Sequence, residues 1–279
     1  MYARKVKGNA LAKMGERDCE EPPLIMRAIV LSAGRGRRLR PTTDEIPKCL
    51  LPVDVDRSVL EVQLRTLAHC GIQHVTIMVG YGAEKVEHFL TTHPIANLTV
   101  QTRYNPFFAT TNTVVTCWLA IPEMRDDFVL LNGDTLFEGE ILRRVLMAPE
   151  APLTMAIDQK VNYDEDDMKV ALNGGKQLKA VGKILPASMV DGESIGLMRF
   201  CEKGTAAFRS ALDVAVRNPA VLQKWYHDII NMMADSLRVE TVLIKGLWWK
   251  EIDTPVDLSE VRAYFSARRA EVSYVPLRG

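Results

Sequence analysis

The strongest constraint on the fold lies in residues 26–53, where an apolar run gives way to glycines and a cluster of positive charge. Residues 28–31 are continuously apolar, which is typical of a buried strand. Gly34 and Gly36 follow, and Lys48 closes the stretch after arginines at positions 35, 37, 38 and 40. Glycines let backbone N–H groups approach an anion closely, and nearby cations neutralise its charge. The stretch therefore predicts a strand that ends in a phosphate-binding loop.

Strand-like and helix-like patterns alternate along the rest of the chain. Apolar repeats of helical period cover 60–70, 84–91, 205–216 and 222–234, and strand-like runs cover 74–79, 98–102, 128–134, 153–157, 193–200 and 239–244. A turn signal at 173–175 separates two further short strands, 169–172 and 178–181. We therefore expect an α/β fold with a mostly parallel central sheet flanked by helices, and a small antiparallel region. Ligands of such folds bind beyond the carboxyl ends of the strands, where Gly34 and Gly80 lie.

Charge and composition exclude several classes of protein. The chain has 35 basic and 35 acidic residues, so its positive charge is local to one loop and gives no reason to expect a nucleic-acid partner. Five cysteines are scattered singly, which argues against a disulfide scaffold or a zinc site. No run approaches the roughly 18 apolar residues that span a bilayer, and the N-terminus lacks the apolar region of a signal peptide. These features predict a cytoplasmic protein without membrane insertion.

The domain organisation is expected to be simple. Length and patterning suit a single domain over residues 26–267. Residues 1–25 are of mixed charge and weak pattern, so we interpret them as an N-terminal extension. Residues 268–279 are left as a C-terminal tail.

The residues of the loop resemble the pattern G-x-G-x-R followed by P-K in the sugar-phosphate nucleotidyltransferase superfamily. The resemblance is carried by Gly34, Gly36, Arg38, Pro47, Lys48 and the run 51–53, and it extends over residues 26–265. It implies a Rossmann-like, GT-A-like fold and an enzyme that moves a nucleoside monophosphate from an NTP to a phosphorylated acceptor, releasing pyrophosphate. Arg38 and Lys48 are then the catalytic cations.

The same resemblance implies a nucleotide site around the loop. Its residues would be Leu31, Ala33, Gly34, Gly36, Gly80 and Tyr81. Thr111 and Asn112 precede a predicted apolar helix, and the resemblance gives them contacts to base and ribose. The alternative is that they only cap this helix, with Thr110 or Thr111 as the N-cap.

Two aspartates are candidate ligands of Mg²⁺. Asp134 ends a buried strand in a Gly-Asp pair, and carboxylate oxygens suit this hard cation. Asp253 lies in the run E-I-D-T-P-x-D-L, which resembles the second metal-binding aspartate of the superfamily followed by a helix. We expect the sheet to bring these two residues together.

The acceptor is less constrained than the reaction. The resemblance implies a lysine for the acceptor phosphate at Lys183, which we favour over Lys169, although either could instead be an exposed surface lysine. It also implies that the strand of Glu193 lines the acceptor pocket, so Glu193 is either a partner for a polar or cationic group or an exposed residue at the end of a strand. A choline head would need a cage of aromatic rings, which could be formed by Trp225, Tyr226 and the tryptophans at 248 and 249. The alternative is that these side chains only belong to the hydrophobic core. Details such as N-P-F-F…T-N-T and D-M-K-V resemble the phosphocholine and phosphonate cytidylyltransferases. We therefore expect CTP, or failing that another NTP, as donor and a phosphocholine or aminoalkylphosphonate type of acceptor, with sugar-1-phosphates and inositol-1-phosphate as alternatives.

Two interpretations from other functional classes of protein remain open. A dinucleotide-binding Rossmann enzyme would have a third glycine where this chain has Leu39. An inactive subunit that senses nucleotides on the same fold is the other reading, and Mg²⁺-dependent release of pyrophosphate would separate it from an enzyme. The sequence does not reveal the oligomeric state, and it allows a homodimer.

Overall fold

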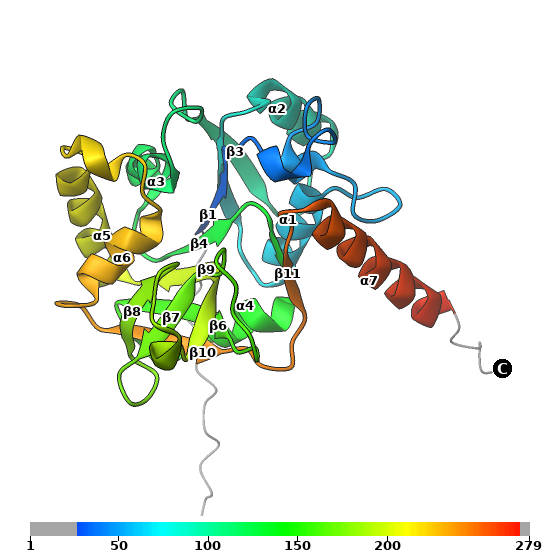
Figure 1. The fold of residues 1–279 in the computed structure, drawn as a ribbon. Helices are drawn as coiled ribbons and strands as arrows, with labels where there is room; N and C mark the ends of the chain where they lie inside the picture. Colours follow the sequence, from blue (N-terminus) through cyan, green and yellow to red (C-terminus); the bar gives the residue numbers. More distant parts are fainter. Residues whose placement is uncertain (1–26, 274–279) are drawn as a thin grey trace, which may run out of the picture.

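The computed structural model of the chain describes residues 27–273, with side chains up to residue 269, so the predicted extension 1–25 lies outside the described residues. The strands are β1 (Arg27–Ser32), β2 (His74–Val79), β3 (Thr99–Tyr104), β4 (Phe128–Asn132), β5 (Thr135–Phe137), β6 (Leu153–Asp158), β7 (Lys169–Leu172), β8 (Leu178–Gly182), β9 (Gly192–Phe200), β10 (Val239–Leu243) and β11 (Trp249–Glu251). The main sheet has the order β10-β6-β9-β4-β1-β2-β3 (Figure 1). β1 pairs in parallel with β2 and β4, whereas β9 runs antiparallel between β4 and β6.

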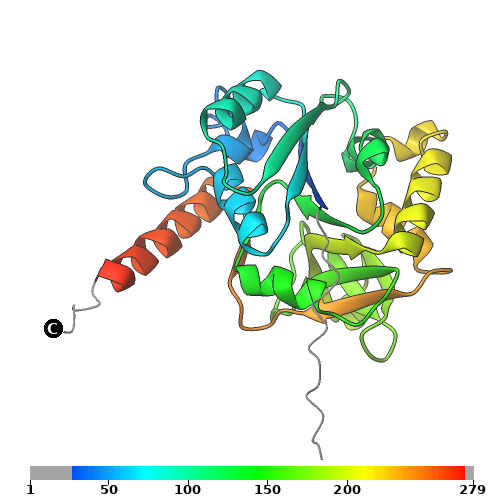
Figure 2. The ribbon, with the colours of Figure 1, turned by 180° about the vertical axis from the view of Figure 1, so that it is seen from behind.

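Helices cover both faces of this sheet, as the sequence predicted. They are α1 (Val59–His69), α2 (Ala83–Thr92), α3 (Thr113–Leu119), α4 (Gly139–Leu146), α5 (Glu202–Ala215), α6 (Tyr226–Met233) and α7 (Pro255–Ser273). Side chains alternate along β1, so Ala28 and Val30 pack towards α1, α2 and α4, while Ile29 and Leu31 pack towards α3, α5 and α6. Figures 1 and 2 show α3, α5 and α6 gathered on one side. None of the helices in the described part is long and apolar enough to cross a membrane.

A third, smaller core holds the functional loops. It joins Leu39 and Leu51 from the loop after β1 with Ile252 from the segment after β11. Each of these side chains is at most 1% exposed. Two short 3₁₀ helices, η1 (Arg37–Leu39) and η2 (Lys48–Leu50), carry the loop residues; three others are η3 (Ile121–Glu123), η4 (Ala187–Met189) and η5 (Pro219–Val221). Segments far apart in sequence are thereby fixed at one edge of the sheet.

Several boundaries differ from the sequence expectations. The N-cap of α3 is Asn112, not Thr110 or Thr111, because its side-chain oxygen accepts the N–H of Thr113. α6 begins at Tyr226 instead of 222, since η5 and a turn precede it. α7 continues to Ser273, beyond the expected domain boundary at 267, and extends outward from the sheet (Figure 1). The antiparallel region was expected, and it consists of β7, β8 and β9.

Candidate active site

Arg38 is presented by a tight turn after β1. Gly36 has a backbone φ of +60°, a left-handed conformation that glycine adopts without strain. The hydroxyl of Thr43 donates a 2.8 Å hydrogen bond to the Gly36 carbonyl and holds the turn closed. Leu39, next in the chain, is buried in the third core. The turn and this anchor together fix the backbone that carries Arg38.

Asp134 emerges beside the same loop because Gly133 lets the chain come close to β1. The N–H of Gly133 donates to the carbonyl of Leu31 at 2.9 Å. A Cβ at this position would lie 2.0 Å from the hydroxyl oxygen of Ser32, so only glycine fits. The turn from β4 to β5 therefore places Asp134 at the carboxyl end of β1.

Asp253 reaches this place from the far end of the sequence. β11 pairs antiparallel with β5, and the N–H of Ile252 donates to the carbonyl of Asp134 at 3.0 Å. The Ile252 side chain is buried, so its neighbours Glu251 and Asp253 point away from the core. The structure thus brings together the two predicted metal ligands, Asp134 and Asp253, and adds Glu251 to them.

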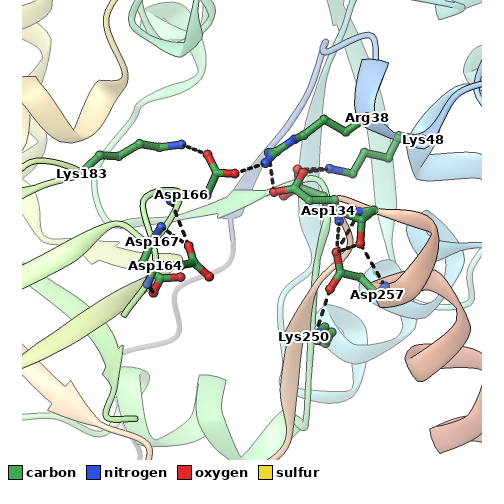
Figure 3. A network of polar contacts seen from close by, with 11 residues as sticks. Arg38, Lys48, Asp134, Asp164, Asp166, Asp167, Lys183, Lys250 and Asp257 are labelled. Carbon is green, nitrogen blue, oxygen red and sulfur yellow. Dashed lines mark hydrogen bonds and ion pairs between the residues drawn. The ribbon is translucent and has the colours of Figure 1, made fainter. Parts of the chain in front are cut away.

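Two cations bind these carboxylates (Figure 3). Nζ of Lys48 lies 2.7 Å from one oxygen of Asp134 and 2.7 Å from one oxygen of Asp253. Nη2 of Arg38 lies 2.7 Å from the other oxygen of Asp253. Burial acts to lower the pKa of Lys48, but the charges of Asp134 and Asp253 outweigh it and raise this pKa above its ordinary value. Lys48 is therefore a permanent cation at the centre of the site.

The carboxylates have the donor chemistry that a hard divalent cation requires. Asp134, Glu251 and Asp253 present oxygen atoms within 4.8 Å of one another. Oδ1 of Asp134 is buried and has no hydrogen-bond partner among the residues that the structure describes. Glu251 is open to the cleft, yet desolvation by the cleft walls and the charges of the two aspartates raise its pKa to about 8. The three residues therefore fit Mg²⁺, whose charge would favour the ionised form of Glu251.

Two adjoining hollows meet at this cluster. One, the loop hollow, has a volume of about 250 Å³ and includes Arg38, Lys48 and Asp134 in its walls. The other, the inner hollow, has about 240 Å³ and leads from Arg38 and Asp134 towards α3 and α6. The predicted nucleotide residues Leu31, Ala33, Gly34 and Gly36 line one or both. Gly80 and Tyr81 brace the loop instead, since the N–H of Tyr81 donates to the carbonyl of Ala33 at 3.1 Å.

Thr111 and Asn112 line the inner hollow together with the ring of Phe108. Oδ1 of Asn112 caps α3 at 2.8 Å from the N–H of Thr113, and its Nδ2 lies 3.3 Å from the carbonyl of Gln223. The hydroxyl of Thr111 donates to the carbonyl of Phe107 at 2.8 Å. Helix capping thus accounts for the position of Asn112. Asn112 also lines the inner hollow, so its contact with a nucleobase stays a prediction.

Lys183, Trp225 and Tyr226 also line the inner hollow, on the side opposite the loop. Nζ of Lys183 lies 4.8 Å from the centre of the Trp225 ring and 3.0 Å from Asp166. The hydroxyl of Tyr226 donates to Oδ1 of Asn132 at 3.2 Å, and its ring is buried. These three predicted acceptor residues therefore share one wall of the cleft.

Lys169 and Glu193 lie elsewhere. Nζ of Lys169 donates to the backbone carbonyls of Asp164 and Lys183, so this buried lysine ties a loop to the end of β8. Glu193 is 5% exposed and lies 3.1 Å from Nζ of Lys160, which also binds Asp167 at 2.7 Å. Glu193 lines a third hollow of about 540 Å³, the acidic hollow, which adjoins the cleft at Arg38 and Asp253. The two residues are not brought beside Trp225 and Tyr226.

The burial of Glu193 predicts a pH-dependent stability. Desolvation raises its pKa from 4.5 to about 7, although Lys160 opposes the shift. The folded state binds this proton more tightly than the unfolded chain, so the stability that Glu193 contributes falls as pH rises between these two values. We expect Glu193→Gln to gain stability relative to the parent protein on going from about pH 5 to about pH 8. Denaturant unfolding at both pH values measures the change, with the exposed Glu165→Gln as matched control. If the free energies of unfolding of Glu193→Gln and of the parent protein change equally between the two pH values, this prediction is wrong.

Other residues of the cleft were not anticipated from the sequence. Glu251 is two positions before Asp253, a spacing that puts both on one side of an extended segment and could have revealed it. Ser194 and His227 line the inner hollow, with Oγ and Nε2 3.3 Å apart, and burial lowers the pKa of His227 to about 3, so it is neutral. Asp166 lies in a run of four acidic residues, 164–167, which is typical of a solvated loop, and nothing in the sequence signals its contacts across the cleft.

Sequence comparisons relate the chain to nucleotidyl transferases. A family model described as nucleotidyl transferase matches residues 27–162. CMP-5'-(3-aminopropyl)phosphonate synthase from Streptomyces rubellomurinus is 37% identical over 131 residues, which covers 47% of this chain and 20% of that protein. Choline-phosphate cytidylyltransferase from Streptococcus pneumoniae is 31% identical over 114 residues, which covers 41% of this chain and 47% of that protein. The alignments span between 20% and 55% of the length of the first curated relatives that the chain matches.

The fold has counterparts among solved structures. The inositol-1-phosphate CTP transferase from T. maritima aligns with a TM-score of 0.71 at 21% sequence identity, covering 88% of this chain and 97% of that one. A likeness at this identity shows the fold alone. It confirms the predicted class, a mostly parallel sheet flanked by helices.

Proposed function

Since residues 27–162 belong to the nucleotidyl transferase family, we propose that the chain transfers CMP from CTP to a small acceptor that carries a phosphonate or phosphate group, with release of pyrophosphate. The observation that carries this proposal is the cation pair Arg38 and Lys48, held at the phosphate-binding loop by the carboxylates of Asp134 and Asp253. The names of two relatives, a CMP-aminopropylphosphonate synthase and a choline-phosphate cytidylyltransferase, support a cytidine nucleotide as donor.

The reaction needs positioning and charge neutralisation more than acid–base chemistry. An oxygen of the acceptor phosphonate is already anionic at neutral pH, and it attacks the α-phosphorus of CTP while the bond to the bridging oxygen of pyrophosphate breaks. Lys48 holds the α-phosphate, and Arg38 with the loop N–H groups holds the departing phosphates. Lys183, from the opposite wall, holds the acceptor group. The inner hollow, with Thr111 and Asn112, receives the nucleoside.

Mg²⁺ is the cofactor that we propose. Asp134, Glu251 and Asp253 would hold it, and when bound it offsets negative charge on the phosphates. The partially buried Lys48 between these carboxylates supplies positive charge at the same place.

The walls of the cleft favour an acceptor with a primary ammonium group over one with a quaternary group. A cage for choline needs open aromatic faces. Here Lys183 lies over the Trp225 ring, Tyr226 is buried, and Trp248 stacks on Tyr264 at 3.7 Å. The adjoining acidic hollow is lined mostly by carboxylates. A carboxylate accepts hydrogen bonds, and a primary ammonium group can donate several. An aminoalkylphosphonate therefore suits the site better than phosphocholine.

A matrix of substrates tests the proposal. We expect pyrophosphate release to be fastest with CTP and 2-aminoethylphosphonate or 3-aminopropylphosphonate, and kcat/KM with phosphocholine to be lower by about tenfold or more, because its head cannot donate N–H bonds to carboxylates. ATP, GTP, UTP and dTTP form the other axis, with inositol-1-phosphate and hexose-1-phosphates among the acceptors. Pyrophosphate is measured in a coupled assay with Mg²⁺ present.

Arg38→Gln serves as the control for contaminating activity in this matrix. A hexose-1-phosphate or inositol-1-phosphate as the best acceptor would contradict the acceptor class while keeping the reaction. Binding of CTP without pyrophosphate release across the whole panel would favour a nucleotide sensor over an enzyme.

A further inference from the structure

Asp166 connects the two opposite walls of the cleft. Its Oδ2 lies 2.5 Å from Nη1 of Arg38, and its Oδ1 lies 3.0 Å from Nζ of Lys183 (Figure 3). One carboxylate thus binds a cation of the loop after β1 and a cation at the end of β8. Lys183 is the first cause, and Arg38 a further one, of an Asp166 pKa below its usual range, so the group is ionised at neutral pH.

The loop that carries Asp166 is firmly held at its base. Nζ of Lys160 binds Asp167 at 2.7 Å, and Oδ2 of Asp167 accepts the N–H of Asp164 at 2.7 Å. Nζ of Lys169 donates to the Lys183 carbonyl at 3.0 Å and joins the loop to β8. The Asp166 side chain, by contrast, is 63% exposed. Its carboxylate can therefore turn away while the base of the loop keeps its contacts.

Arg38 and Lys183 are also the cations that the proposed function gives to the two substrates. Phosphate and phosphonate oxygens accept the same N–H donors that a carboxylate accepts, and charge-assisted bonds to a triphosphate are strong. An exposed ion pair with a carboxylate is weak by comparison. The N–H groups that now point at Asp166 cannot bind both, so Asp166 and the substrates compete for them.

We propose that Asp166 is an internal competitor of the substrate phosphates and that its displacement couples the donor site to the acceptor site. The inference rests on the proposed function. When the donor phosphates take Arg38, they repel the Asp166 carboxylate, and Lys183 loses its partner and becomes available to the acceptor. The coupling is reciprocal. An alcohol without a phosphate or phosphonate cannot replace Asp166 at Lys183, so Asp166 also determines specificity for anionic acceptors.

The test compares Asp166→Asn with the parent protein by calorimetric titration. We expect Asp166→Asn to bind CTP about twofold to fivefold more tightly, the size expected when one exposed ion pair no longer competes. A CTP analogue with a methylene bridge between the α- and β-phosphates should tighten binding of 2-aminoethylphosphonate in the parent protein, and much less in Asp166→Asn. Asp56→Asn makes the same chemical change at an exposed position outside the three hollows, and it should change these affinities less than about twofold.

Inorganic tripolyphosphate is titrated alongside CTP, because the competition concerns phosphate oxygens and not the base. Equal or weaker binding of both anions by Asp166→Asn would overturn the proposal and make Asp166 a support for the two cations. Tighter binding of tripolyphosphate by Asp166→Asn, with no binding of CTP by either protein, would uphold the competition and overturn the choice of donor alone.

Discussion

Replacing Asp134 by asparagine is expected to lower kcat about a hundredfold or more. Asparagine keeps the shape of the side chain and loses its charge. Oδ2 of Asp134 lies 2.7 Å from Nζ of Lys48. The buried Oδ1 of Asp134 has no partner in the described part of the chain, so it is available to a metal ion. The variant would hold both Lys48 and Mg²⁺ less firmly. The measurement is pyrophosphate release at saturating CTP and acceptor over a titration of Mg²⁺.

The control for this variant is Asp56→Asn, which makes the same chemical change at an exposed position in the loop before α1. It should retain the parent rate and thermal midpoint. Asp134→Asn should also need more Mg²⁺ to reach its own maximum, because one of three carboxylates is neutral. A parent rate with the parent dependence on Mg²⁺ would remove Asp134 from the mechanism.

The fold was predictable where local pattern and tertiary environment agree. The apolar runs of β1, β2 and β4 are buried on both faces, so their composition alone indicated strands. The hairpin of β7 and β8 followed from its Asn-Gly-Gly turn. The place of β9 was not predictable, because a strand that runs antiparallel between β4 and β6 has the same apolar pattern as a parallel one.

Convergence within the site could be predicted for residues that stand at strand ends. Asp134 lies between β4 and β5 and Asp253 follows β11, and the pairing of β11 with β5 places both beside Lys48. Asn112 shows the limit of such reasoning. Three successive polar residues, 110–112, could each cap α3, and Asn112 is the one that does. The N–H of Asn112 donates to the carbonyl of Leu222, which is distant in sequence, and this contact places Asn112 at the start of the helix.

Contacts across the cleft could not be predicted. Asp166 lies 128 positions from Arg38, and its neighbours in sequence are also acidic, so no pattern distinguishes it from a solvated loop residue. Lys169 and Lys183 are both candidate phosphate ligands by sequence, since Lys169 begins a short strand and the resemblance implies a phosphate-binding lysine at Lys183. The structure separates them, since Lys169 donates to backbone carbonyls while Lys183 points into the cleft.

Replacing Lys48 by methionine is expected to lower kcat and kcat/KM together, by about a hundredfold, because the proposed reaction assigns this cation to the α-phosphate, where negative charge grows during transfer. A second effect distinguishes Lys48 from an ordinary phosphate ligand. Its Nζ is 2.7 Å from both Asp134 and Asp253, and without it the two carboxylates repel each other. The variant should therefore unfold at a lower temperature than the parent protein.

The two effects respond differently to Mg²⁺. A divalent cation held by the proposed ligands Asp134, Glu251 and Asp253 would replace the lost positive charge, so Mg²⁺ should raise the thermal midpoint of Lys48→Met more than that of the parent protein. It should not restore turnover, because the α-phosphate still lacks its cation. Lys179→Met, an exposed change on β8, is the matched control for both measurements. If Mg²⁺ raises the thermal midpoints of Lys48→Met and of the parent protein equally, the carboxylates do not hold the metal. If Mg²⁺ restores turnover of Lys48→Met, Lys48 only neutralises the charge of Asp134 and Asp253.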